Sequence, residues 1–142
     1  MSLGAFAVIF DDERRVLLCH RRDMDAWNLP GGRVEEAEAP WDAAIRETQE
    51  EVGLEVEVTR LTGLYWKPET AEVVFAFECR VLSGAPGLSD EADEVGYFAF
   101  DALPKNTGQK HLERIRDAMV GGPPVLRTQS GPGMRELFGS RT

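Results

Sequence analysis

Short runs of apolar residues, each bounded by polar or turn-forming residues, recur along this chain and predict β-strands. The expected strands cover residues 4–10, 16–20, 55–59, 61–66, 73–82 and 95–100. A polar turn at 11–14 separates the first two runs, which are therefore expected to form a hairpin. The run at 73–82 is nearly continuous in apolar residues, so it is expected to be buried on both faces at the centre of a sheet.

Two segments have the periodicity of amphipathic helices, residues 39–52 and residues 109–119. In the first segment, four residues form a stripe that is expected to pack on a core: Trp41, Ile45, Thr48 and Val52. Gly53 follows directly and suits the left-handed conformation that often closes a helix. Strands on either side of this helix, with a second helix late in the chain, predict an α/β fold in which helices cover both faces of a mixed sheet.

Three glutamates, Glu47, Glu50 and Glu51, share another side of the first expected helix. At roughly 100° per residue they lie within about 100° of one another. Like charges three or four residues apart destabilise a helix by about 0.2–0.5 kcal/mol per pair, so a cluster of this kind calls for an explanation. A hard divalent cation such as Mg²⁺, which prefers oxygen ligands, is one explanation, and a solvated acidic face is the alternative.

Composition narrows the classes of function that the chain can have. Its 142 residues suffice for one domain, and residues 121–142, rich in Gly, Pro, Ser and Arg, are expected as a partly flexible tail appended to it. A net charge of −9 argues against binding to nucleic acid or to an acidic membrane. The N-terminal apolar run follows no basic residues, and no run has the length of a membrane span, so a cytoplasmic protein is expected. Cys19 and Cys79 lack the spacing of a metal site and are expected as buried thiols.

Residues 32–54 carry the spacing G-x5-E-x7-R-E-x-x-E-E-x-G, which resembles the signature of the Nudix hydrolases. The Trp-Asn-Leu-Pro-Gly-Gly sequence at 27–32 is similar to a lead-in that is common in the same family. Two positions depart from the family pattern, Thr48, where an aliphatic residue is commoner, and Ala37, where relatives often have glycine. The resemblance covers about residues 4–120. It implies a Nudix-type α/β/α sandwich around a mixed β-sheet, with the hydrolase domain at 1–120.

The resemblance also implies roles for single residues. The implied ligands of Mg²⁺ or Mn²⁺ are Glu47 and Glu51 as principal ligands, Glu50 as a further ligand and the Gly32 carbonyl as a backbone ligand. Arg46 would pair with Glu38 and hold the loop against the helix. Because Arg46 is expected to share no face with the centre of the three glutamates, its part in catalysis is expected to be structural.

The general base has candidates in two places. Glu47 and Glu50 lie on the helix, and Glu91 and Glu94 lie in an acidic segment near the last expected strand. A carboxylate that already binds a cation is a poor proton acceptor, which favours the separate segment. Glu91 is preferred over Glu94 because a loop residue can swing toward substrate.

Substrate contacts are expected upstream of the signature. One of Arg21 and Arg22 would point toward the site and bind phosphate, although a solvated strand end is an equal alternative. Trp27 is considered as a platform for stacking a base, although packing at a junction between loop and sheet is the commoner role of such a residue.

The function hypothesis is metal-dependent hydrolysis of a nucleoside diphosphate linked to another moiety, such as ADP-ribose or a related nucleotide sugar. One alternative is a hydrolase of oxidised nucleoside triphosphates. Another is a non-catalytic nucleotide-binding regulatory module, which would have no need of all three glutamates. A Ca²⁺-binding scaffold is disfavoured because the spacing of an EF-hand is absent from the sequence. The expected partner is a small nucleotide, and a homodimer is left open.

Overall fold

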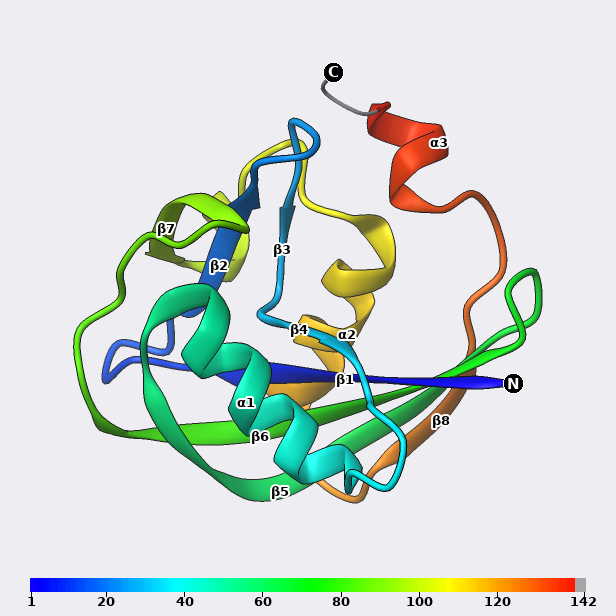
Figure 1. Ribbon diagram of the computed structural model, residues 1–142, viewed down its shortest axis with the longest axis horizontal. Coiled ribbons are helices and arrows are strands. Elements are labelled where there is room, and N and C mark those ends of the chain that lie inside the picture. The colour runs from blue at the N-terminus through cyan, green and yellow to red at the C-terminus, as the bar shows by residue number, and fades with distance from the viewer. Residues whose placement is uncertain (140–142) are drawn as a thin grey trace.

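The strands of the protein lie in two sheets, as seen in the computed structural model, which describes residues 1–139 (Figure 1). The larger, mixed sheet has the strand order β4-β1-β6-β5-β8, and an antiparallel sheet has the order β3-β2-β7. The strands are β1 Ser2–Ile9, β2 Val16–Arg21, β3 Trp27–Asn28, β4 Gly31–Arg33, β5 Glu55–Lys67, β6 Glu72–Ser83, β7 Ala92–Phe98 and β8 Val125–Thr128. The helices are α1 Pro40–Val52, α2 Gln109–Val120 and α3 Met134–Phe138, and a short 3-10 helix spans Phe100–Ala102.

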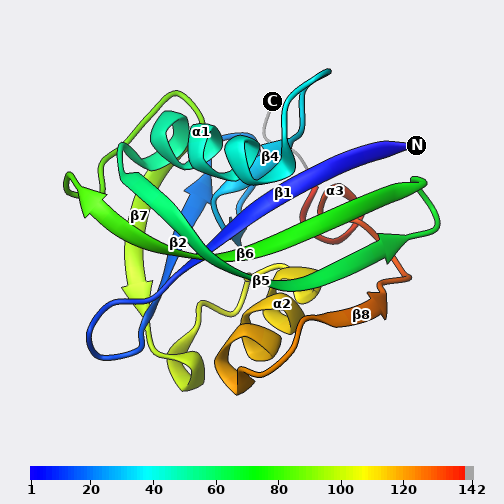
Figure 2. The same ribbon diagram turned by 90° about the horizontal axis from the view of Figure 1, so that it is seen from below.

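Helices cover both faces of the larger sheet (Figure 2). On one face, Ala43 and Val52 of α1 belong to the same buried cluster as Ala7 of β1. On the other face, Ile115 of α2 belongs to a second cluster with Val8 of β1. Neighbouring residues of β1 therefore enter two different cores. The predicted α/β/α sandwich is confirmed, and β6 is the central strand, as its apolar run predicts.

The hairpin expected between residues 4–10 and 16–20 is wrong. The two segments share one isolated bridge, between Phe10 and Val16, and then diverge into different sheets. One edge of β1 pairs with β6 along residues 2–9, and the other pairs with β4 at residues 4–6. β2 instead pairs with β3 and β7. The two segments expected at 55–59 and 61–66 form one strand, β5, whose register shifts between Val58 and Arg60 and again between Leu61 and Gly63.

The packing stripe of α1 is also different from the expected one. Trp41 is 55% exposed, because it lies in the first turn of α1 beyond the region that contacts the sheet. The buried positions are Ala43, Ala44, Thr48, Glu51 and Val52. Two alanines thus take the place expected for Trp41, and the stripe is rotated far enough to bury one of the glutamates.

The segment expected as a flexible tail contributes to the fold over residues 121–139. Its strand β8 pairs in parallel with β5. Arg127 donates to both carboxylate oxygens of Asp117 on α2 at 2.8 Å, and Gln129 is buried. These contacts hold the segment against the sheet and α2, and residues 140–142 lie outside the described part of the chain. Cys19 and Cys79 are buried free thiols, as expected.

Within residues 1–139, no helix is long and apolar enough to cross a membrane.

Candidate active site

Two glycines of β4 bring its backbone against α1. The N–H of Gly31 donates to Oε2 of Glu51 at 2.7 Å. A Cβ added at Gly32 would lie 2.8 Å from the carboxylate carbon of Glu47, and one at Gly31 would lie 2.4 Å from the carbonyl oxygen of Ala5. At Gly31 a side chain would collide with the backbone of β1, and at Gly32 it would displace the Glu47 carboxylate from its position beside the backbone.

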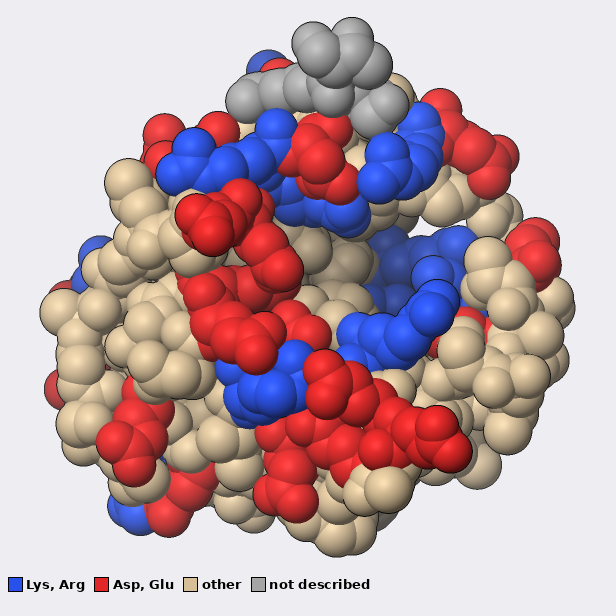
Figure 3. All heavy atoms as spheres, viewed as in Figure 1, with Lys and Arg blue, Asp and Glu red and all other residues tan. Residues whose placement is uncertain are grey.

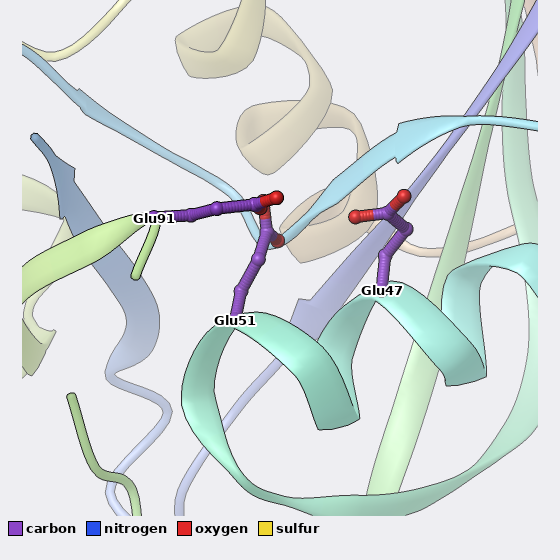
Figure 4. A group of neighbouring side chains, drawn as sticks. All are labelled: Glu47, Glu51 and Glu91. Carbon is purple, nitrogen blue, oxygen red and sulfur yellow. The ribbon is translucent and has the colours of Figure 1, made fainter. Parts of the chain in front are cut away.

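Glu91 joins these two glutamates from the other sheet. It lies directly before β7, and its side chain points toward Glu47 and Glu51 (Figure 4). One carboxylate oxygen from each residue lies within 4.8 Å of the others, which is close enough for a shared metal ion. The backbone carbonyl of Glu91 accepts the Arg22 N–H at 3.1 Å, and its own N–H donates to Oγ of Ser89 at 3.2 Å. These bonds fix the segment that carries Glu91.

Burial changes the acidity of the cluster. Glu51 is 8% exposed, and its burial raises its pKa to about 9, with the charges of Glu47 and Glu91 adding to the effect and the Gly31 N–H opposing it. The pKa of Glu47 is also raised, chiefly by burial, against the opposing effect of Arg46. Burial therefore destabilises the anionic forms of Glu47 and Glu51, and a divalent cation would stabilise them. The donor set therefore fits a hard metal ion.

Arg46 ties the loop before α1 to the helix. Its Nε donates to Oε2 of Glu38 at 2.8 Å and its Nη2 donates to Oε1 of Glu38 at 3.1 Å, so the pair implied by the resemblance is present. The expectation that Arg46 stands apart from the glutamates is wrong, because its Nη1 lies 3.1 Å from Glu47 and 3.2 Å from Glu50. The loop itself contains Ala37 with φ of +65°, a left-handed conformation that favours glycine.

Two of the expected acidic residues lie outside the cluster. Glu50 is 53% exposed in its side chain and pairs with Arg46. Glu94 lies on β7 opposite His20 and lines a separate hollow, which Lys105 also lines. Among the described residues, the acidic group near α1 therefore consists of Glu47, Glu51 and Glu91, and Glu94 faces elsewhere.

The residues expected to contact substrate are divided between two environments. Arg21 and Arg22 both line the large cavity beside the carboxylates. Arg21 is held by Asp23 through two hydrogen bonds of 2.8 and 2.6 Å, and Nε of Arg22 donates to the Ser89 carbonyl at 2.7 Å. Trp27 is 7% exposed, and it packs edge-on against the His20 and Phe98 rings. Such a buried indole has no free face on which a base could stack.

The cavity has a volume of about 1170 Å³ and is bordered by charges of both signs. Figure 3 shows acidic side chains on one side of the hollow and basic side chains along the others. Sequence reasoning did not identify six basic residues of its wall, which are Arg33, Lys67, Lys110, Arg114, Arg116 and Arg135. One signal was available, because Arg114 falls on the same helical stripe as the apolar Ile115 and Ala118, where a charged residue is unusual.

Comparison with known proteins agrees with the geometry of this site. Residues 2–118 match the model of the NUDIX domain. The chain is similar to a MutT-like protein of Streptomyces ambofaciens, with 32% identity over 92% of this chain and 84% of that protein. It is also similar to a putative 8-oxo-dGTP diphosphatase of Bacillus subtilis, with 31% identity over 92% of this chain and 89% of that protein. The crystal structure of an ADP-ribose pyrophosphatase from Streptococcus suis has a TM-score of 0.74 and 28% identity, over 90% of this chain and 98% of that one. The family match over nearly the whole chain shows that this protein belongs to the Nudix hydrolases, enzymes that act on small nucleotide substrates.

Proposed function

We propose that this protein is a Mg²⁺- or Mn²⁺-dependent pyrophosphohydrolase that cleaves a nucleoside diphosphate linked to another moiety. The observation that carries the proposal is the group of Glu47, Glu51 and Glu91 beside the Gly31–Gly32 backbone, at the edge of a cavity with a partly basic wall. Carboxylates suit the cation, and arginines suit the phosphates.

Each residue of the site has a proposed task. Glu47 and Glu51 would hold the metal ion, with the Gly32 carbonyl and Glu50 as further ligands. When bound there, such an ion would supply neutralisation of phosphate charge and a more acidic water. Glu91, the most exposed member of the group, accepts the proton of the attacking water. Arg46 and Glu38 hold the ligand-bearing helix against its loop, while Arg21 and Arg22 contact the phosphates.

ADP-ribose and related nucleotide sugars are the first substrates to test, because the structural relative from Streptococcus suis is an ADP-ribose pyrophosphatase. Oxidised nucleoside triphosphates are the second group, because the Bacillus subtilis relative is named as a putative 8-oxo-dGTP diphosphatase. Both groups are incubated with the protein and Mg²⁺ or Mn²⁺, and products are measured by phosphate release after treatment with a phosphatase. The proposal expects hydrolysis of at least one group, abolished by EDTA. Folded protein that hydrolyses neither group with either metal would refute it.

A further inference from the structure

One arginine of the cavity wall is buried without a carboxylate partner. Arg114 is 2% exposed, and its Nε and Nη2 both donate to Oε1 of Gln129, at 3.1 and 2.9 Å. Its guanidinium carbon lies 5.1 Å from the ring centroid of Phe6 and 5.6 Å from that of Tyr65. Within residues 1–139, no carboxylate forms an ion pair with it. A buried guanidinium whose close contacts are one amide and two aromatic rings lowers the stability of the fold unless an opposite charge compensates it.

Two lysines line the same cavity as Arg114. Lys67 ends β5 and Lys110 lies in the first turn of α2, and they are two of the three lysines in the whole chain. Burial, together with the charges of Lys67 and Arg114, lowers the pKa of Lys110. The charges of Glu69 and Glu136 oppose this effect, so carboxylates of the protein itself offset part of the repulsion among the three cations.

The nearby carboxylates compensate these charges only in part. Glu72 binds Nζ of Lys67 at 3.0 Å, and Glu113 accepts a hydrogen bond from the amide of Gln129 at 3.0 Å. Lys110 has a carbonyl for its partner, that of Gly131 at 3.1 Å. Glu69 and Glu136 also act on Lys110 through their charges, but within the described residues no carboxylate forms an ion pair with Lys110 or Arg114.

The ring of Phe6 connects this basic group to the acidic one. A Cβ at Gly31 would lie 2.4 Å from the Phe6 ring, and the N–H of Gly31 binds Glu51. The same ring lies under the guanidinium of Arg114. Both groups line one continuous cavity, so a single substrate can reach both.

We infer that Arg114, Lys67 and Lys110 form a second anion site, which binds a phosphate that the substrate carries in addition to its scissile diphosphate. The inference rests on the proposed function for the diphosphate itself. It narrows the substrate class to nucleoside diphosphates whose linked moiety bears its own phosphate, and it disfavours neutral sugars at that end. Charge-assisted hydrogen bonds from lysine and arginine are the contacts that such a phosphate would receive.

The first test measures binding without catalysis. Inorganic pyrophosphate is titrated into the full-length protein in EDTA by calorimetry, because without a cation the carboxylates of Glu47, Glu51 and Glu91 repel this probe. The wild type is expected to bind it saturably, and Lys67→Gln and Lys110→Gln are each expected to weaken binding about tenfold. Lys105→Gln is the matched control, because Lys105 is exposed and lines the other hollow. Absence of saturable binding, or equal binding by all four proteins, would overturn the site, whatever the outcome of the hydrolysis assay.

The second test distinguishes a substrate phosphate from a free anion. The values of kcat/KM are compared for ADP-ribose and for ADP-ribose that carries a phosphate on its terminal ribose. The wild type is expected to prefer the phosphorylated compound at least tenfold, and the Lys67→Gln/Lys110→Gln double variant is expected to lose that preference. Pyrophosphate binding without any such preference would overturn the assignment to the substrate. Arg114→Gln tests the third residue of the anion site by the same measurements. If that variant does not fold, the Lys67→Gln and Lys110→Gln variants alone decide the outcome.

Discussion

Replacing Glu51 with glutamine should make the metal-free protein more stable at neutral pH while removing its activity. Glu51 is 8% exposed, its Oε2 accepts the Gly31 N–H at 2.7 Å, and its pKa is raised to about 9 from 4.5. Between these two values the folded protein retains a proton that the unfolded chain has released. Its free energy of unfolding therefore falls as pH rises through this window and is highest below the lower value.

The size of the effect follows from the pKa. A single site of this kind loses about 1.4 kcal/mol of stability per pH unit, or about 3 kcal/mol between pH 5.5 and pH 7.5 as an upper bound. Glutamine keeps an oxygen for the Gly31 N–H but carries no titrating group, so the variant should lack this part of the slope. At pH 7.5 in EDTA its melting temperature should exceed that of the wild type by several degrees.

The assay is chemical denaturation of both proteins in EDTA over this pH range, followed by addition of Mg²⁺. Metal should stabilise the wild type but hardly the variant, and kcat/KM of the variant should fall by about 10²–10³-fold. Glu50→Gln is the matched control for the pH dependence of stability alone, because it removes the same charge from the next position, where the side chain is 53% exposed. Equal slopes for wild type and Glu51→Gln, or unchanged hydrolysis at limiting Mg²⁺, would refute the reasoning.

Three further predictions concern the rest of the site. Arg46→Lys should lower stability and activity together, because lysine cannot make the bidentate contact with Glu38. Loss of activity with unchanged melting temperature and metal affinity would indicate a direct catalytic role instead. Glu91→Gln should lower kcat by about 10²–10⁴-fold with little change in KM, whereas Glu94→Gln, which lies outside the cluster, should have near-wild-type kinetics. If both variants keep their kcat, the base belongs on α1. Ala37→Gly should raise the free energy of unfolding by up to about 1 kcal/mol, because glycine adopts a left-handed φ of +65° without the steric cost that alanine has. A lower free energy of unfolding for the variant in urea denaturation would contradict this account.

Much of this protein could be predicted from local patterns. Residues four apart lie on the same face of a helix, whatever the helix packs against. The proximity of Glu47 and Glu51 therefore follows from their spacing in the sequence. The position of β6 at the centre of its sheet follows from its apolar run, because only a strand with two covered faces keeps so few polar residues. The close approach of the Gly32 backbone to the Glu47 carboxylate also agrees with a glycine expected beside a charged group.

Other features depended on which strands pair. The sequence did not reveal that β2 pairs with β7 and not with β1. Apolar runs show that a strand forms, but they do not show which other strand it pairs with. That pairing carries Glu91 to the two glutamates of α1 while it turns Glu94 toward His20. The sequence alone favoured Glu91 over Glu94 only by the mobility expected of a loop residue, and it did not show the strand pairing that separates the two side chains.

The basic wall of the cavity was decided by tertiary structure alone. Lys67, Lys110 and Arg114 come from β5 and α2. The two lysines resemble ordinary surface cations in their local sequence, and the position of Arg114 on the apolar stripe of α2 was the one local signal. They meet because α2 packs on the larger sheet and because β8, within the segment expected to be a flexible tail, places Gln129 against Arg114. The periodicity of α1 is determined by interactions over a few residues. Burial of a charge depends on packing between segments far apart in the chain, so only the folded structure determines it.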